Sequence, residues 1–540
     1  MKIRGKILKK SAPFLVVLMV FSIFPLNSAW ASTSPAWSWT NINQVGLDEM
    51  QAFFGPGGAF SAESDLNWSS QMNPTELGKT LTYNYPHFYY ALPSCSSQIK
   101  VGCIEAVEYR LKGESWEPAK LSDRQLKTRN GEMGTSGRNA SGVISTREFN
   151  VWEADSNLHL PSGGVASFWK FPKAPHGGGN DYLVRVNVSG IRSAQPTWSD
   201  GKIQRYLEMN IFPFDGKTEF EFPKEIEIKV RLRLGVVSGD LWGWFDGRID
   251  NPDLKLDSKS KLGIFEISGT PSWIPIGLTP TRKLSEIGNE VKSLFTCPSG
   301  LPQSMCPSVS GIKGFSTEGN AEISNFTLFE NALGKSKTIA YRTEWWVKST
   351  RWPDVANSES CPAVKDGFVG IVTTNASMYT PSAPLWNAVD STFEFQVASP
   401  HLALDGSTNK GYYSLILPRK LAECRWGKDI DSARAVVSVV NAEGITNVTS
   451  VTHTLSKDLL TFKISGFTFS APTIKVGLTS DKQTGPSASP LPTSEKSSTS
   501  SKKGVRAALT KKVTIICIKG KTIKKVTAQT PKCPAGYIQR

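Results

Sequence analysis

The sequence has little of what marks most enzymes, metal proteins and cofactor proteins. Its five histidines, at positions 87, 159, 176, 401 and 453, are not grouped at metal-ligand spacings, and no C-x-x-C pair is present. It also lacks G-x-S-x-G, H-E-x-x-H, P-loop and EF-hand patterns. We therefore expect no metal, no cofactor and no catalytic residue that can be named from a motif.

Two partial matches to enzyme motifs lack their required context. His176-Gly177-Gly178-Gly179 matches the oxyanion loop of esterases, but without the nucleophile elbow it predicts only a flexible loop. Glu153 and Asp155 match the start of the E-x-D-x-x-E strand of laminarinase-like glycosidases, but the final Glu is absent. Because a carboxylate pair can come from anywhere in a chain, a glycan-active hydrolase stays open as an alternative.

Long apolar runs are also scarce. The one clear run, residues 14–24, follows five positive residues and precedes Ala29-Trp30-Ala31. This order predicts a secretory signal peptide over residues 1–31, cleaved after Ala31, and a secreted protein. No later stretch is apolar enough for a transmembrane span.

The eight cysteines all lie after the predicted signal peptide. An even number of cysteines in an exported chain favours disulfides. Pairing of neighbouring cysteines predicts four bridges, namely Cys95–Cys103, Cys297–Cys306, Cys361–Cys424 and Cys517–Cys533. Other connectivities stay open.

Acidic residues are missing from the end of the chain. The formal net charge is +15, but residues 32–480 carry 44 basic and 45 acidic residues. Residues 501–540 carry eleven Lys or Arg and no acid. We therefore expect that the body does not bind nucleic acid. We also expect that the basic tail anchors the protein to anionic envelope polymers or glycans. The anchor lysines are Lys511, Lys512, Lys519, Lys521, Lys524 and Lys525.

The body has the pattern of a mainly β protein. In residues 225–234, EIEIKVRLRL, apolar and charged residues alternate, which predicts a strand with one face in water. Helical periodicity occurs only at residues 282–295 and 321–334, where Gly334 is placed as a C-cap.

These patterns divide the chain into six parts. We predict a signal peptide (1–31), two β-sandwich-like domains (32–280 and 336–480) and a small helical junction between them (281–335). A disordered Ser- and Pro-rich linker (481–508) and a disulfide-closed β-hairpin (509–540) follow.

Tryptophan supplies the candidate ligand-binding residues. Exposed Trp rings form flat platforms that suit sugar rings. The candidates are Trp242, Trp244, Trp345, Trp346 and Trp352. The alternative for each is that it fills the core, as most Trp side chains in β proteins do.

The tail also carries a resemblance. The pattern T-I-x-C-x-K-G-K-x-x-K-K-V-T at 514–527, followed by P-K-C-P-x-G-Y at 531–537, resembles the C-terminal module of uncharacterised secreted actinobacterial envelope proteins. Segments 242–252, 370–379, 411–427 and 466–478 are similar to parts of the same proteins. The resemblance implies an exported, envelope-associated β protein and assigns no catalytic residue.

Together these observations predict a secreted, envelope-associated β protein that binds glycans or surface polymers. The alternatives are a secreted glycan-active hydrolase and a structural protein that assembles with copies of itself. Oligomeric state stays open.

Overall fold

The computed structural model describes the parts of the chain between residues 34 and 539 that are listed next. They are residues 34–38, 42–56, 87–124, 135–138, 144–147, 166–191, 204–235, 241, 243–257, 259–295, 310–315, 323–350, 361, 368–380, 383–427, 430–440, 450–469, 473–479, 513–519, 522–528 and 538–539. The described chain divides into two compact units, one ending at Gln483 and the other beginning at Thr484. The predicted signal peptide and linker lie outside the described residues.

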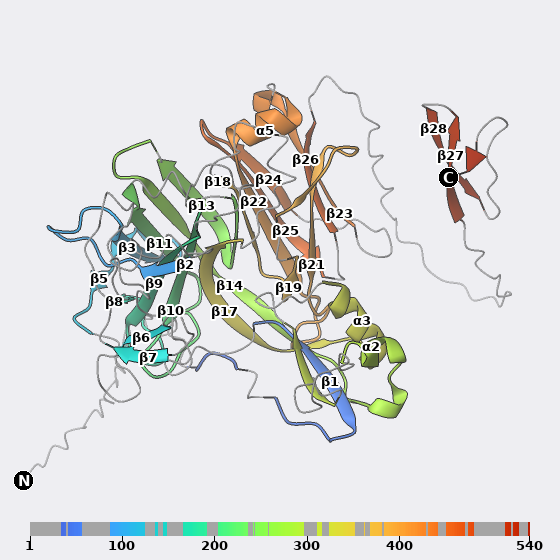
Figure 1. Ribbon diagram of the computed structural model, residues 1–540, viewed down its shortest axis with the longest axis horizontal. Helices are drawn as coiled ribbons and strands as arrows, with labels where there is room; N and C mark the ends of the chain where they lie inside the picture. The colour runs from blue at the N-terminus through green and yellow to red at the C-terminus, as the bar shows by residue number, and fades with distance from the viewer. Residues whose placement is uncertain are drawn as a thin grey trace, which may run out of the picture. The chain divides into compact units, whose positions relative to one another are not determined.

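The first unit is mainly β, as predicted (Figure 1). Its first strands are β1 (Glu49–Phe54), β2 (His87–Ala91), β3 (Cys103–Leu111), β4 (Glu117–Pro118), β5 (Lys120–Leu121), β6 (Thr135–Arg138), β7 (Ile144–Arg147), β8 (Ser167–Lys170), β9 (Asp181–Ile191), β10 (Gln204–Pro213), β11 (Ile226–Arg233), β12 (Gly243–Gly247), β13 (Ile249–Asp257), β14 (Ile264–Leu278) and β15 (Arg282–Lys283). The later strands are β16 (Gly311–Phe315), β17 (Lys337–Ser349), β18 (Phe368–Thr374), β19 (Met378–Tyr379), β20 (Leu385–Asn387), β21 (Thr392–Ala398), β22 (Lys410–Pro418), β23 (Arg434–Val440), β24 (Ser450–Leu455), β25 (Leu459–Thr468) and β26 (Thr473–Thr479). The helices are α2 (Asn289–Ser293), α3 (Ile323–Leu333) and α5 (Arg419–Trp426), with short 3₁₀ turns η4 (Leu284–Glu286) and η7 (Ile430–Ser432).

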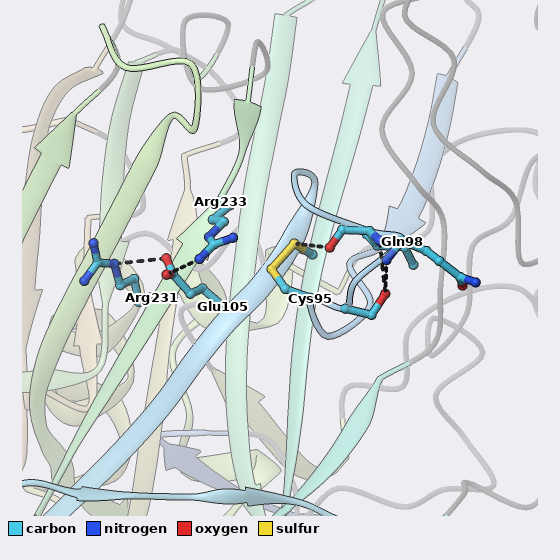
Figure 2. The surroundings of a disulfide bond; sticks show 8 residues. Cys95, Gln98, Glu105, Arg231 and Arg233 are labelled. Carbon is cyan, nitrogen blue, oxygen red and sulfur yellow. Dashed lines mark hydrogen bonds and ion pairs between the residues drawn. A yellow bond between two sulfur atoms is a disulfide. The ribbon is translucent and has the colours of Figure 1, made fainter.

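Strand β11 shows how the sequence pattern becomes structure. It pairs antiparallel with β3 on one side and β14 on the other, and its apolar side chains are buried on one face. The charged side chains lie on the other face, where Glu105 of β3 bridges Arg231 and Arg233 at 3.1 and 2.6 Å (Figure 2). The predicted half-buried strand with charges in water is confirmed.

Two long strands tie the unit together. β14 pairs with β11 and β13 through its first half and with β17 and β1 through its second half. β17 in turn pairs with β14, beside it in Figure 1, and then with β10 and β12. β14 and β17 come from opposite sides of residues 281–335, so this sheet contains strands from both of the predicted β domains. Sequence patterns predict where strands lie but not which distant strand each one pairs with.

Buried side chains form separate clusters on either side of β17. Trp345 and Val347 join the cluster made by β3, β9, β10 and β11, whereas Trp346 joins the cluster made by β18, β21, β22 and β25. Successive side chains of a strand point to opposite faces, so one strand supplies both cores. The second half of β17, from Trp345 to Val347, is therefore buried on both faces.

The helices of residues 281–335 cover β1. Phe326, Phe329 and Leu333 of α3 are buried against Phe54 and its neighbours, as the helical periodicity predicts. Gly334 follows α3 with a φ of +105°, and its amide donates to the Glu330 carbonyl at 3.0 Å, so the predicted C-cap is confirmed. The first predicted helix is reduced to η4 and the five-residue α2. α5 lies in a segment for which the sequence pattern predicted no helix.

In the second unit, β27 (Val513–Lys519) pairs antiparallel with β28 (Thr522–Ala528), and β29 (Ile538–Gln539) pairs with the other edge of β27. Lys519 lies opposite Thr522 in this register, and Cys517 lies opposite Lys524. Cys533 lies outside the described residues, so a bridge to Cys517 stays a prediction.

Packing at β12 sets the environment of Trp244. β12 pairs with β17 on one side and with β18 on the other, and all five of its residues are buried. The Trp244 ring lies over Gly370 of β18, where an added Cβ would stand 2.4 Å from a ring carbon and 2.9 Å from the Ile416 carbonyl oxygen. Glycine at 370 therefore makes room for the indole.

We predict that Gly370→Ala destabilises the protein by about 1–3 kcal/mol, because the extra methyl overpacks this layer. Trp244→Phe in the Gly370→Ala background should recover part of the loss, since the smaller ring withdraws from the methyl. Urea unfolding of the two single variants and the double variant measures the coupling. Strictly additive losses would contradict the contact.

Candidate functional site

A pocket of about 430 Å³ lies where β14 and β17 meet the connection between β21 and β22. Trp273 of β14 lines it with its side chain 40% exposed, whereas its neighbours Ser272 and Ile274 are fully buried on the opposite face. Trp273 pairs with Thr343, and Pro275 pairs with Tyr341, so Trp273 and Tyr341 are diagonal neighbours on one face. Their ring centroids lie 6.5 Å apart with the planes tilted by 58°. The pocket therefore has an exposed aromatic wall.

A tight turn forms the opposite wall. The Ala403 amide donates to the Ser407 carbonyl at 2.8 Å, and Gly406 takes a φ of +80°, which glycine adopts without strain. Asp405 Oδ1 accepts from the Ser407 amide at 2.9 Å and from the Ser407 hydroxyl at 2.6 Å. These bonds fix the shape of the turn from within.

Asn409 fixes the turn to the sheet. Its side chain is buried, and Nδ2 donates to Thr338 Oγ1 and to the Pro400 carbonyl, both at 2.8 Å. Its Oδ1 accepts from the Tyr341 hydroxyl at 2.8 Å. One amide thus sets both the position of the turn and the position of the Tyr341 ring, which preorganises the pocket.

The lining combines apolar and polar side chains. The apolar ones are Trp273, Pro275, Tyr341, Ala403 and Leu404, and the polar ones include Asn375, Asp405, Ser407 and Lys410. The hydrogen bonds from Ser407 lower the pKa of Asp405, so its carboxylate is charged at neutral pH. Burial, together with the Asp405 charge, raises the pKa of Tyr341, which keeps its proton. Aromatic and aliphatic surface with a few fixed polar groups is typical of small-ligand sites.

The tryptophans chosen from the sequence lie elsewhere. Trp244, Trp345 and Trp346 are 2%, 1% and 7% exposed, so they do not form the surface platform that the glycan hypothesis placed there. They are buried because β12 and the second half of β17 are covered on both faces. The Trp345 and Trp346 indole nitrogens donate to the Gly269 carbonyl and to Glu344 Oε2. Trp242 and Trp352 lie outside the described residues.

Sequence reasoning missed Trp273 and Tyr341. A usable signal was present, because Ile274 and Ile276 alternate with Trp273 and Pro275 in β14. Alternation places Trp273 on the face opposite the isoleucines. Which face is covered depends on pairing with distant strands, and sequence alone does not give that.

Two of the four predicted disulfides are present in the described part of the chain. Cys95–Cys103 closes the turn before β3, and Cys361–Cys424 joins residue 361 to α5 across 63 residues (Figure 2 shows the first bridge). Cys297 and Cys306 lie outside the described residues. Among the proposed anchor lysines, Lys519 is in β27 and Lys524 and Lys525 are in β28, while Lys511, Lys512 and Lys521 lie outside the described residues.

Three carboxylates gather around one buried arginine, Arg342. Its Nη2 donates to both oxygens of Glu219 at 3.0 and 3.1 Å, and its Nε donates to Glu344 at 3.0 Å. Glu221 accepts from the Trp37 amide and from Thr343, and burial raises its pKa. Burial alone would lower the pKa of Arg342, but the Glu219, Glu344 and Glu221 charges hold it above its usual value. Every carboxylate oxygen in this cluster accepts a hydrogen bond from the protein. The cluster therefore joins Trp37, β17 and residues 219–221, and its carboxylates are used by the fold.

We predict that Arg342→Met destabilises the protein by about 3–5 kcal/mol, because it leaves buried carboxylates without their cation. The matched control is Arg231→Met on the charged face, whose side chain is 44% exposed and whose loss should cost less than about 1 kcal/mol. Chemical unfolding measures both. Equal losses in the two variants would contradict the structural role of Arg342.

His176 forms a compact structural turn instead of the predicted flexible loop. Its backbone amide and carbonyl bond to those of Gly179 at 2.7 and 3.1 Å. Its Nδ1 accepts from the Gly178 amide at 3.1 Å, so Nε2 carries the proton and donates to the Asp181 carbonyl at 2.6 Å. Burial lowers the pKa of His176, although the charges of Asp215 and Asp181 oppose this. The ring is used by the fold and has no access to a substrate carbonyl.

Within the described ranges, no three His, Cys, Asp or Glu side chains are grouped to hold a metal ion. In the same part of the chain, no helix combines the length and apolarity needed to cross a bilayer.

Comparison with known proteins finds no family model, no curated protein and no solved structure that matches this chain. The resemblance to secreted actinobacterial envelope proteins therefore stays a prediction.

Proposed function

We propose that this protein is a secreted, envelope-associated binding protein whose body holds a glycan in the Trp273 pocket. The observation that carries the proposal is the 40% exposed Trp273 ring beside Tyr341, facing a polar turn that the protein's own hydrogen bonds hold in place. A sugar ring has a C–H face that packs on an indole and hydroxyls at its edge that bond to polar groups. Because the turn is already held in place, less conformational entropy is lost when a ligand binds.

The pocket is better suited to binding than to glycoside hydrolysis. Hydrolysis needs two carboxylates on opposite sides of the glycosidic bond. Among the described residues that line the pocket, Asp405 is the single carboxylate. The hydrogen bonds from Ser407 lower its pKa, so it holds no proton to give as a general acid. Glu153 and Asp155 lie outside the described residues.

We predict that Trp273→Ala lowers binding to wall or polysaccharide fractions by about tenfold or more, because it removes the stacking surface. The matched control is Trp116→Ala, which removes a tryptophan lying between Arg110 and Lys229 on the charged sheet face. Pull-down of the purified variants, each checked for thermal unfolding, gives the comparison. If Trp116→Ala weakens binding as much as Trp273→Ala does, the pocket is not the site.

The tail serves as a second, electrostatic contact. Residues 501–540 carry eleven cations and no acid, beside a body with nearly balanced charge. We propose that Cys517 and Cys533 close this part into a small basic hairpin module, since so few residues build too small a core alone. Its partner is an anionic envelope polymer.

For the body, we propose that the clusters on the two faces of β17 are the cores of sandwich-like layers.

We predict that replacing Lys519, Lys521, Lys524 and Lys525 with Gln weakens retention on an anionic wall fraction at low salt and flattens its salt dependence. The control replaces four exposed lysines of the body with Gln, namely Lys259, Lys261, Lys283 and Lys337, and should leave retention unchanged. Sedimentation with the wall fraction at increasing salt measures both. Retention that is unchanged by the four hairpin substitutions would contradict the anchor.

A further inference from the structure

We propose that β24 is the contact through which two copies of this chain associate, by antiparallel pairing of the strand with its own copy. This contact is independent of the proposed glycan binding, because no residue of β24 lines the Trp273 pocket. Three observations carry the proposal. The strand is an open edge, it lacks the features that keep such edges apart, and its free backbone groups match those of its own copy.

β24 is an edge strand. It pairs antiparallel with β25 on one side and, among the described residues, with no strand on the other. Its first five residues are exposed, Val451 by 38%, and only Leu455 is partly covered. β23, the edge strand of the five-stranded sheet, lies beside it. The open side of β24 therefore offers backbone N–H and C=O groups to another strand.

The usual protection of an edge strand is missing from β24. Natural proteins keep edges apart with charged side chains, prolines and bulges. β13, whose described partner is β14 alone, has all three: Pro252, the charges of Asp253, Lys255 and Asp257, and a shift of register after Asp250. β24 reads SVTHTL, without Pro, Lys, Arg, Asp or Glu, and pairs with β25 in unbroken register. The same chain thus protects one edge and leaves the other open to pairing.

The turn between β24 and β25 shows which backbone groups face outward. The Ser456 amide donates to the Leu459 carbonyl at 2.8 Å, so these two residues form a hydrogen-bonded pair. Hydrogen-bonded and non-hydrogen-bonded pairs alternate along an antiparallel ladder. Counting back from Ser456, the pairs that Leu455, His453 and Val451 make with β25 are therefore of the non-hydrogen-bonded kind. The N–H and C=O groups of these three residues point to the open edge.

A two-fold axis at His453 matches these groups with those of a second copy. In antiparallel pairing centred there, His453 lies opposite itself, Val451 opposite Leu455, and Thr452 opposite Thr454. The outward groups of all three residues are then hydrogen-bonded. Apolar pairs and Thr–Thr pairs stabilise a sheet across strands. Because a single pair of strands buries little area, we expect a weak dimer that depends on concentration.

The test uses the position of His453 opposite its own copy. Sedimentation velocity of the full mature chain should show a shift from monomer toward dimer as the concentration rises. His453→Lys and His453→Glu should each weaken association by about fivefold, because like charges then face each other. An equimolar mixture of the two variants should restore it, because lysine then faces glutamate.

A proline variant gives a second readout. His453→Pro should abolish association and leave the thermal unfolding temperature nearly unchanged, because the N–H that it removes is not used by the β25 ladder. His453 is exposed, so the two charged variants should also keep their unfolding temperature. Val436→Lys, which adds a charge to the neighbouring strand β23, should weaken association less than His453→Lys does.

Four results would overturn the proposal. The first is a chain that stays monomeric at every concentration. The second is association that the His453 variants leave unchanged. In the third, both charged variants weaken association but their mixture does not restore it, so the two-fold register at His453 is wrong. In the fourth, Val436→Lys weakens association as much as His453→Lys or more, which would assign the contact to β23.

Discussion

The pairing of β14 with β17 is the constraint on which the rest of the first unit depends. These strands come from distant parts of the sequence and pair from Ser272–Glu344 to Leu278–Lys337. Arg342 lies within this ladder and draws Glu219 and Glu344 to it. Because burial makes an unpaired charge costly, this arginine favours one arrangement of the strands around it. The same ladder places Trp273 diagonally opposite Tyr341, so the register that builds the core also builds the pocket.

The central position of β17 explains why some aromatic rings are available to a ligand and others are not. Its two faces supply two cores, and Trp345 and Trp346 are used to fill them. β14 differs at Trp273, whose side chain is 40% exposed although Ser272 and Ile274 on the other face are fully buried. On the Trp273 face, this part of β14 meets the Asp405 turn instead of a second layer of strands. Exposure of Trp273 is thus a consequence of where the layers end.

Local features of the fold were predictable from sequence, whereas distant pairings were not. Alternation predicted β11, helical periodicity predicted α3 with its Gly334 cap, and proximity predicted the Cys95–Cys103 bridge, since each depends on nearby residues. The pairing of β14 with β17, which lie on either side of residues 281–335, depends on strands far apart in the chain, and so does the burial of Trp244. The pocket was missed for the same reason. Its two walls, at Trp273 and Asp405, are far apart in the chain, and the hydrogen bond from Tyr341 to Asn409 helps to join them.

The central claim is that a ligand sits between the Trp273 ring and the Asp405 turn. Hydroxyl-radical footprinting of the mature chain, with and without solubilised wall polysaccharide, reads side-chain exposure directly. The structure predicts that the polysaccharide protects Trp273 and Leu404 and leaves Trp116, on the charged face, as reactive as before. Unchanged oxidation of Trp273 under saturating polysaccharide, or protection at Trp116 instead, would contradict it.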